Sequence, residues 1–408
     1  MASAYPTANR IHGKTARRLL LMVTFLLGTS MGCGSSNSPA TQEKLQFVVD
    51  ANWIAYKEQY SIPSGGLAVY FETPSGAYFA SSGMPPGVDQ NTHFRVASNT
   101  KTFTAAAIML LYEQGKLQLD DTIVSNIPGT TTPYVPDTTA YNIPYKNSIT
   151  IRQLLGHLAG VFDVTNNPIP DTCAVPYAGK LYLNYVRYEL GDDNHQFTFD
   201  ELVGVVANCQ LSHYPPGGNY KYSNTGYSLL GKIIERVSGL SYDQFIIQNL
   251  IVPNSLSATS VPVLGTDTSI PSPYVDGYSF DQVTLTNWTI DNMSGNNAEG
   301  NIISTQADLA LWVKRLLTGN AGISPVGVNM MKTLSAASGY TCGLGITYEK
   351  GLGYGKDGAH NGFLSLMLYD PDDDVTMVIY FNILDYNITA QAALMTKVAR
   401  EAKHTLGY

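Results

Sequence analysis

Ser98 and Lys101 lie three residues apart in the segment Phe94-Arg95-Val96-Ala97-Ser98-Asn99-Thr100-Lys101. The residues that follow have one apolar face with helical spacing, made by Phe103, Ala106, Ala107, Leu110 and Leu111. Gly115 is placed to end this helix. Ser98 and Lys101 would then project from the same side of the first turn, beside unpaired N–H groups and the positive end of the helix dipole. A lysine desolvated there has a lowered pKa and can take the serine's proton, which is the chemistry of an activated nucleophile.

Two further polar clusters are candidates for the same site. Tyr222-Ser223-Asn224 precedes a predicted helix, and His360-Asn361-Gly362 precedes a predicted strand over 363–369. A serine with a lysine three residues later arises about once or twice by composition alone in a chain of this length. A tyrosine in a loop usually packs, and a lone histidine is usually a satisfied surface group. No single cluster therefore identifies a site, and their order along the chain carries the inference.

Three motifs occur in order along the chain, namely Ser-x-x-Lys at a helix start, Tyr-Ser-Asn before a second helix and His-x-Gly before a C-terminal strand. This combination has a known parallel. It resembles the serine β-lactamase and penicillin-recognising D-Ala-D-Ala carboxypeptidase family, in its class C-like branch. The likeness continues in four further stretches, namely 113–121, 149–157, 216–239 and 304–310. It covers roughly residues 45–405.

The resemblance implies a set of proton-transfer roles. Ser98 would be the nucleophile, Lys101 its proton acceptor, and Tyr222 the group that passes a proton to the leaving nitrogen. These roles agree with elementary chemistry, because a serine needs a base and a leaving amine needs an acid.

The resemblance also implies substrate contacts. Asn224 would bond the substrate's amide, and His360 and Gly362 would line the strand side, where His360 meets a terminal carboxylate. The backbone N–H groups of Ser98 and Phe363 would form the oxyanion hole. His157 is expected to be structural.

The substrate follows less directly from these motifs. The chain contains no Lys-Ser/Thr-Gly, and a third motif that begins with His360 favours the carboxypeptidase, D-aminopeptidase and esterase branches over efficient class C β-lactamases. The leading prediction is a secreted serine hydrolase that acts like a D-alanyl-D-alanine carboxypeptidase. The alternatives are an esterase, a D-aminopeptidase or a β-lactamase with the same acyl-enzyme, and a β-lactam sensor that is acylated without turnover.

Strand signals lie near both ends of the chain and helix signals lie in the middle, which predicts an α+β fold. The resemblance implies a β-lactamase/transpeptidase-like architecture with a five-stranded antiparallel sheet flanked by helices. We assign the α/β lobe to residues 45–120 and 298–408, and a mainly helical lobe with long loops to residues 121–297.

The N-terminus has the features of an export signal. Arg10, Lys14, Arg17 and Arg18 precede a short apolar run over 19–27, which predicts a signal peptide over residues 1–32. Gly32-Cys33 resembles the end of a bacterial lipoprotein signal, so we expect lipid on Cys33, a flexible tether over 33–44 and a periplasmic or cell-surface location.

The remaining composition limits cofactors and partners. In an exported protein we expect a disulfide between Cys173 and Cys209, with Cys342 left over. No cluster has metal-ligand spacing, so neither a metal nor another cofactor is expected. Charged residues make up only 14% of the chain, which disfavours a nucleic-acid footprint. The expected partner of this monomer is a small-molecule or peptide substrate, with possible membrane attachment through the lipid.

Overall fold

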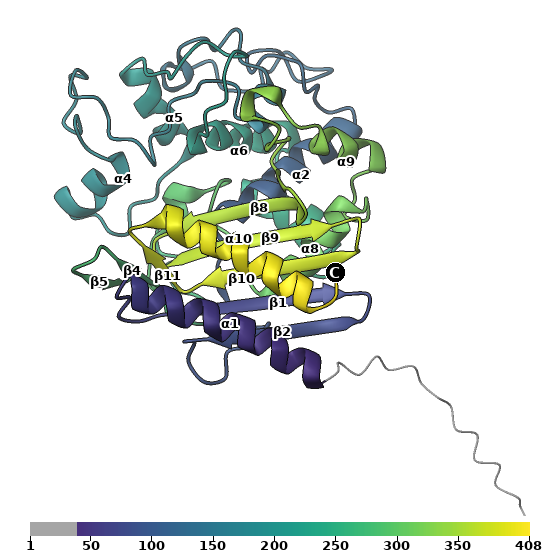
Figure 1. Ribbon diagram of the computed structural model, residues 1–408. Helices are drawn as coiled ribbons and strands as arrows, with labels where there is room; N and C mark the ends of the chain where they lie inside the picture. Colours follow the sequence, from purple (N-terminus) through teal and green to yellow (C-terminus); the bar gives the residue numbers. More distant parts are fainter. Residues whose placement is uncertain (1–38) are drawn as a thin grey trace, which may run out of the picture. The chain divides into compact units, whose positions relative to one another are not determined.

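A six-stranded antiparallel sheet is built from segments near both ends of the chain in the computed structural model, which describes residues 39–408 (Figure 1). Its strands in spatial order are β2 (Gly76–Ser82), β1 (Leu67–Thr73), β10 (Val375–Phe381), β9 (Phe363–Asp370), β8 (Gly353–His360) and β7 (Thr347–Glu349). The prediction of five strands was one too few, because the short strand β7 pairs with the first residues of β8. The fold class was predicted correctly.

Alternate side chains of the central strands feed two hydrophobic cores, one on each face of the sheet. Val69 and Ile379 belong to the core under α1 (Pro39–Gln59) and α10 (Ile388–Thr405), which lie side by side across that face (Figure 1). Val378 belongs to the opposite core, where α8 (Gln306–Leu317) packs on β9 and β10. Because both faces are covered, β9 and β10 are almost continuously apolar rather than alternating.

The helical lobe lies beyond the β8 side of the sheet and is made of short helices and long loops (Figure 1). Its helices are α2 (Thr100–Glu113), α3 (Ile151–Leu155), α4 (Tyr182–Asn184), α5 (Phe199–Asn208), α6 (Asn224–Ser238), α7 (Tyr242–Ile246) and α9 (Pro325–Lys332). Ser223 caps the start of α6, and Gly239 ends it in the left-handed conformation, at a φ of 74°. Helix α2 packs on α6 and α7 and also contacts β8, so the nucleophile helix lies between this lobe and the sheet, whereas the predicted boundary at residue 120 had assigned it to the α/β lobe.

Two other predicted boundaries need correction. Strands β4 (Tyr278–Phe280) and β5 (Leu285–Asn287) fall in the range predicted as helical lobe, but β4 pairs with β11 (Ile383–Asp385), just after β10. The predicted tether over 33–44 is also too long, because α1 already begins at Pro39, and proline is well suited to the first turn of a helix. The predicted signal peptide and Cys33 lie outside the described residues. Within residues 39–408, no helix is both long and apolar enough to cross a membrane.

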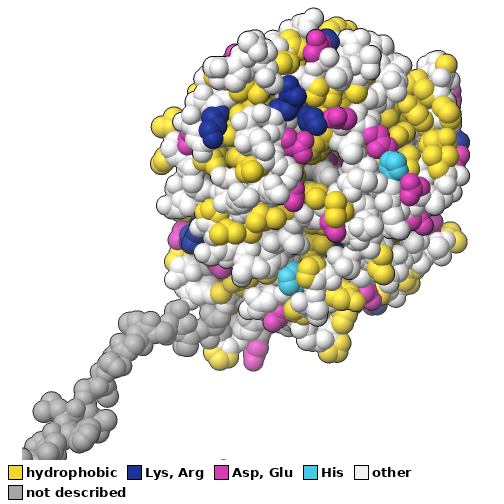
Figure 2. All heavy atoms as spheres, turned by 180° about the vertical axis from the view of Figure 1, so that it is seen from behind, with side chains coloured by type: hydrophobic (Ala, Val, Ile, Leu, Met, Phe, Trp, Pro, Cys, Tyr) yellow, Lys and Arg dark blue, Asp and Glu magenta, His cyan; other side chains and the backbone are white. Residues whose placement is uncertain are grey.

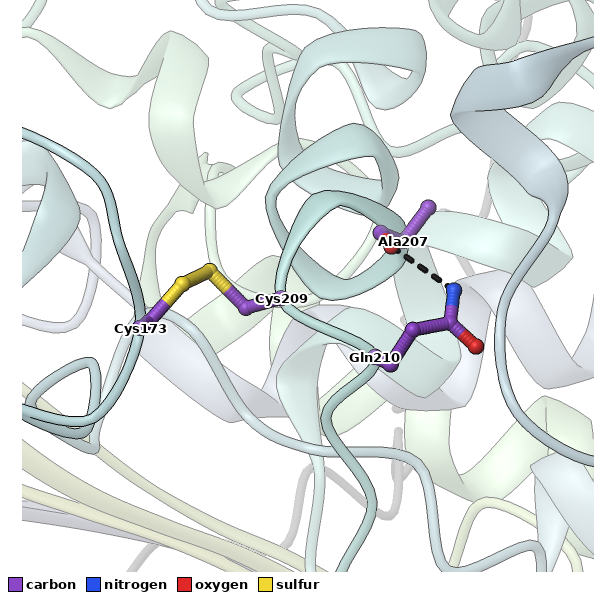
Figure 3. The surroundings of a disulfide bond; sticks show 4 residues. All are labelled: Cys173, Ala207, Cys209 and Gln210. Atoms are coloured by element: carbon purple, nitrogen blue, oxygen red, sulfur yellow. Dashed lines mark hydrogen bonds between the residues drawn. A yellow bond between two sulfur atoms is a disulfide. The ribbon is translucent and has the colours of Figure 1, made fainter.

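A disulfide joins the predicted pair, Cys173 and Cys209 (Figure 3). Cys209 ends α5, and Gln210 beside it donates from Nε2 to the carbonyl oxygen of Ala207 at 2.8 Å. The bond therefore attaches the loop around Cys173 to the end of α5. Cys342 is the free cysteine of the described chain and is buried.

The short pair of strands β3 (Phe94–Arg95) and β6 (Ile303–Ser304) holds the segment that leads into Ser98 against the segment that leads into α8.

On the face shown in Figure 2, charged side chains are few and scattered among uncharged ones, as the composition predicts.

Candidate active site

Ser98 lies in a 3-10 turn, Ala97–Asn99, that leads directly into α2, and its side chain is nearly buried. It lines a pocket of about 360 Å³ that also contacts Asn224, Glu299 and Ala359. Ala97 has a φ of 52°, in the left-handed region that non-glycine residues rarely adopt. Such backbone strain persists only where the surrounding structure enforces it, and it is common at functional sites.

The predicted nucleophile is in direct contact with both predicted proton-transfer groups. Ser98 Oγ lies 2.6 Å from the hydroxyl of Tyr222 and accepts a hydrogen bond from Lys101 Nζ at 3.1 Å. Lys101 Nζ also donates to Asn224 Oδ1 at 2.7 Å, to the backbone oxygen of Glu299 at 2.8 Å and to Glu299 Oε2 at 3.0 Å. An ammonium has three N–H groups, so four acceptors compete for them, and Ser98 Oγ is the farthest.

Burial sets the protonation of the two groups that contact Ser98. It lowers the pKa of Lys101 below the usual 10.5, although the carboxylate of Glu299 opposes this shift. It raises the pKa of Tyr222 well above the usual 10.0. Tyr222 is therefore a neutral phenol that can donate a proton, and Lys101 is a lysine whose neutral form is accessible.

Asn224 is held by the start of α6 and by the loop that contains Asp163. The backbone N–H of Asn224 donates to Asp163 Oδ2 at 3.0 Å, and its side-chain Nδ2 donates to Thr165 Oγ1 at 2.8 Å. Its Oδ1 accepts from Lys101. Both the oxygen and the nitrogen of the Asn224 side-chain amide therefore have protein partners. Asn224 also lines the pocket, where a substrate would contact it.

His157 packs behind Tyr222, with the two ring centroids 4.4 Å apart. Its Nδ1 accepts a hydrogen bond from the backbone N–H of Ser223 at 3.3 Å, and burial lowers its pKa well below 6.5. The imidazole is thus a neutral support for Tyr222, in agreement with the structural role expected for it.

Strand β8, which the sequence analysis did not predict, is the strand that approaches Ser98. It contains Lys356-Asp357-Gly358, and a Cβ at Gly358 would come within 2.8 Å of the backbone nitrogen of Ser98. The buried Lys356 Nζ lies 5.6 Å from the centre of the Tyr222 ring and contacts Asp357. Lys356-Asp357-Gly358, and not His360-Asn361-Gly362, is therefore the polar tripeptide beside the nucleophile.

The predicted roles of Gly362 and Phe363 are wrong. His360 and Phe363 pair across the two-residue turn Asn361-Gly362, which connects β8 to β9. Gly362 donates its N–H to Ser279 Oγ at 3.2 Å, and the fully buried ring of Phe363 packs on Phe94 and against the backbone of Gly277. Neither Gly362 nor Phe363 lines the pocket that contains Ser98.

The ladder geometry identifies Ala359 as the replacement for Phe363. Along a strand of an antiparallel pair, successive N–H groups point alternately toward the partner strand and away from it. The two residues that flank a two-residue turn form a hydrogen-bonded pair, so their N–H groups point toward each other's strand. Because His360 and Phe363 flank the turn, the N–H of Ala359 is directed away from β9. On that side β7 reaches only as far as Gly355, and Ala359 lines the pocket next to Ser98.

The far side of the pocket has Arg187 and His360 beside one carboxylate. Asp291 is fully buried and accepts from Arg187 Nη2 at 2.6 Å and contacts His360 Nε2 at 2.8 Å. Its backbone oxygen accepts from the buried Arg95 at 3.4 Å. Burial would raise the pKa of Asp291, but the hydrogen bond of His360 and the charges of both arginines outweigh burial and hold it below 3.8.

Two arginines thus surround a single carboxylate. Arg187 Nε is buried and has no hydrogen-bond partner among the described residues. Arg187 and His360 both line the pocket, and we call them the cationic wall after the charge of Arg187. Ser98 and Asn224 also line the pocket, and with Lys101 and Tyr222, which contact Ser98 but do not line it, we call them the nucleophile wall.

Sequence reasoning found the nucleophile wall and overlooked three other parts of the pocket. A Lys-x-Gly just before a buried strand could have indicated β8, but the motif that was expected there has Ser or Thr at its middle position. Glu299 and Arg187 lie in stretches without a recognisable pattern, so no local signal pointed to them.

A buried Ser-Lys-Tyr network between a helical lobe and an antiparallel sheet defines a class of protein, the serine hydrolases with a β-lactamase-like fold. The family model described as Beta-lactamase matches residues 49–398, and the chain belongs to this family. It is an enzyme of the serine hydrolase type.

Curated relatives include two penicillin-binding proteins. The chain is 28% identical over 312 residues to one from Bacillus subtilis (strain 168), a match that covers 72% of this chain and 61% of the relative. It is 24% identical over 352 residues to penicillin-binding protein 4 of Amycolatopsis lactamdurans, covering 80% and 83%. The chain thus spans only about three fifths of the Bacillus relative.

Similar solved structures include two enzymes of D-amino acid chemistry. The D-stereospecific amidohydrolase from Streptomyces sp. is 26% identical, with a TM-score of 0.69 over 84% of this chain and 94% of that one. The D-amino acid amidase from Ochrobactrum anthropi SV3, complexed with D-phenylalanine, is 21% identical, with a TM-score of 0.67 over 90% and 98%. The second likeness concerns the fold alone.

Proposed function

We propose that the protein is an exported peptidase that acts like a D-alanyl-D-alanine carboxypeptidase through an acyl-enzyme on Ser98. The observation that carries the proposal is the network around Ser98 Oγ, with Tyr222 at 2.6 Å and Lys101 at 3.1 Å. Both distances lie within or close to the range over which a proton can be transferred directly.

The groups of the nucleophile wall account for every proton in acylation. Neutral Lys101 takes the proton of Ser98 while Oγ bonds to the substrate carbonyl carbon. Tyr222 gives its phenolic proton to the leaving nitrogen as the C–N bond breaks, and the proton held by Lys101 then restores the phenol. The N–H groups of Ser98 and Ala359 would stabilise the negative charge that develops on the carbonyl oxygen.

The cationic wall favours a substrate with a free carboxylate over one that ends in an amide. Arg187 lines the pocket and keeps 13% of its side chain exposed while Nη2 binds Asp291, and guanidinium and carboxylate groups have matching geometry. The proposed contact of His360 with a terminal carboxylate fits the same wall, because His360 lines the pocket beside Arg187.

The similarity to the Streptomyces D-stereospecific amidohydrolase supports a second candidate, a D-aminopeptidase or amidase. An esterase or a β-lactamase would use the same acyl-enzyme, and a sensor would form it without releasing product. Only the leaving group and the rate of deacylation separate these alternatives.

The test is to incubate purified residues 34–408 with a reporter penicillin, a nitrophenyl ester, a D-Ala-D-Ala peptide and its C-terminal amide. Intact mass would detect the adduct and chromatography the product. We expect an adduct on the peptide that contains Ser98, its loss in Ser98→Ala, and product release from the carboxylate-terminated peptide. Absence of both adduct and product with every substrate would refute the proposed function, and exclusive turnover of the amide would favour the amidase.

Export and lipid attachment are part of the proposal and are supported by the signal-like residues 1–32 and by Gly32-Cys33. The mass of the mature N-terminus, after expression of the full chain in an exporting bacterial host, tests both. A chain that retains Met1 or carries an unmodified Cys33 would contradict them. The monomeric state stays a prediction.

A further inference from the structure

Glu299 is a buried carboxylate on the pocket wall that the acylation steps above do not use. Glu299 is 2% exposed, and it lines the pocket together with Asn296, Gly300 and Ser98. A charged side chain is rarely buried without a partner or a function, because the loss of hydration is costly.

The contacts of Glu299 connect it to the nucleophile through one nitrogen atom. Its Oε2 lies 3.0 Å from Lys101 Nζ, and the same Nζ lies 3.1 Å from Ser98 Oγ. Its Oε1 accepts from Asn296 Nδ2 at 2.7 Å. Glu299 Oε2 and Ser98 Oγ contact the same nitrogen, so these two oxygens are at most two hydrogen-bond lengths apart. A single water can bridge such a distance.

Each carboxylate oxygen of Glu299 also has capacity for another hydrogen bond. A carboxylate oxygen has two lone-pair sites, and each oxygen of Glu299 has one side-chain donor. A water in the pocket can therefore donate to Glu299 while its oxygen faces a carbonyl carbon attached to Ser98.

Charge neutralisation alone is a poor explanation for this carboxylate. The charge of Glu299 opposes the lowering of the pKa of Lys101, so it works against the neutral amine that acylation requires. Buried ion pairs often add little stability, because desolvation offsets their attraction. A role in deacylation would explain why the site contains a carboxylate, Glu299, that hinders acylation.

We propose that Glu299 is the general base that activates water to hydrolyse the Ser98 acyl-enzyme, an inference that rests on the proposed function. A water proton moves to a carboxylate oxygen of Glu299 as the water oxygen bonds to the acyl carbon. The bond between that carbon and Ser98 Oγ then breaks, and the water proton on Glu299 passes to neutral Lys101 across their 3.0 Å contact. Lys101 gives that proton to Oγ across their 3.1 Å contact, which restores the Ser98 hydroxyl, the neutral amine and the Glu299 carboxylate.

The test compares the wild type with Glu299→Gln, which keeps the size of the side chain and removes its basicity. Acylation is followed as adduct growth by intact mass, and deacylation as adduct decay after rapid removal of free substrate. We expect acylation within about tenfold of the wild type and deacylation slowed about 10²–10⁴-fold, the usual range for a general base. Glu113→Gln, the same change at the exposed end of α2, is the matched control and should behave as the wild type.

Two further arms separate chemistry from structural damage. Hydroxylamine attacks an acyl group without needing a base, so it should release the adducts of the wild type and of Glu299→Gln at similar rates. Glu299→Asp, which retains a carboxylate, should recover part of the deacylation rate. Unchanged adduct decay in Glu299→Gln, equal slowing of both half-reactions, or equally impaired release by hydroxylamine would each overturn the proposal.

Failure of this inference differs from failure of the proposed function. If the wild type forms no adduct, the Ser98 mechanism itself is refuted. If the wild type is acylated and turns over while Glu299→Gln does the same, only the role of Glu299 is lost.

Discussion

The two walls of the pocket differ in how completely their polar atoms are paired. On the nucleophile wall, Ser98 Oγ, Lys101 Nζ and both ends of the Asn224 amide have protein partners. On the cationic wall, the guanidinium of Arg187 lines the pocket and has one carboxylate partner among the described residues, Asp291. A fully paired network positions reacting groups before the substrate arrives, whereas an unpaired donor can gain a partner from the substrate. The difference suggests that the nucleophile wall performs the chemistry and the cationic wall selects the substrate.

Removal of Lys101 should have the largest effect, because it removes the base of the nucleophile wall. We expect Lys101→Met to slow acylation by about 10²–10⁴-fold. The change also leaves Glu299 as an unpaired buried charge, which can cost about 3–5 kcal/mol of stability. The double variant Lys101→Met/Glu299→Gln removes that cost, and its acylation rate should stay equally low. Recovery of the wild-type rate in the double variant would show that Lys101 is not the base.

The pH dependence of acylation sharpens the same prediction. Burial lowers the pKa of Lys101, and only the neutral amine can accept the proton of Ser98. The acylation rate should therefore rise with pH through the pKa of Lys101, at a midpoint below 10.5, and fall as the amine is protonated at lower pH. Adduct formation measured across pH would show this limb in the wild type, and Lys101→Met should lack it.

Ala359→Pro tests which backbone N–H completes the oxyanion hole. Proline has no N–H, and position 359 directs that group away from the β9 ladder, so the hairpin should survive. The loss of one such donor should lower acylation by about 10²–10³-fold, with the fold checked by circular dichroism. Acylation close to the wild-type rate in a folded variant would contradict the role of Ala359 and favour the N–H of Phe363 as the second oxyanion donor.

Arg187→Gln should have the smallest effect of these variants and the most selective one. A hydrogen bond to a charged group is worth about 1.5–3 kcal/mol, or roughly a 10- to 100-fold change in KM. We expect that increase for a peptide with a free carboxylate, and little change for its C-terminal amide or in kcat. Equal effects on both substrates would mean that the cationic wall supports the fold and does not select the substrate.

Much of the fold could be predicted from local patterns. The helix after Ser98, the helix that begins at Asn224 and the strand β9 all followed from local patterns of polar and apolar residues. These signals are strong because each depends on residues within one turn or one strand of each other.

Strand β8 lacks the apolar run of an ordinary strand, and missing it produced the error about Phe363. Glycines and a charged pair make its sequence resemble a loop. The glycines are needed because neighbouring backbone comes very close: a Cβ would lie 1.9 Å from the carbonyl oxygen of Met367 at Gly355, and 2.5 Å from that of Val96 at Gly358. The contact with Met367 comes from the other strand of the hairpin and the contact with Val96 from a distant segment, so neither is visible in the residues of β8 alone.

The sequence by itself determined the types of reacting group and their order along the chain, since Ser98 and Lys101 are one helical turn apart and Tyr222 and Asn224 occur together. Only the tertiary structure decided which backbone N–H faces the nucleophile, which carboxylate contacts Lys101, and that Arg187 and His360 share Asp291. The physical reason is range: helix periodicity fixes neighbours within a few residues, whereas the partners of Lys101 and Asp291 come from distant segments that only packing brings together.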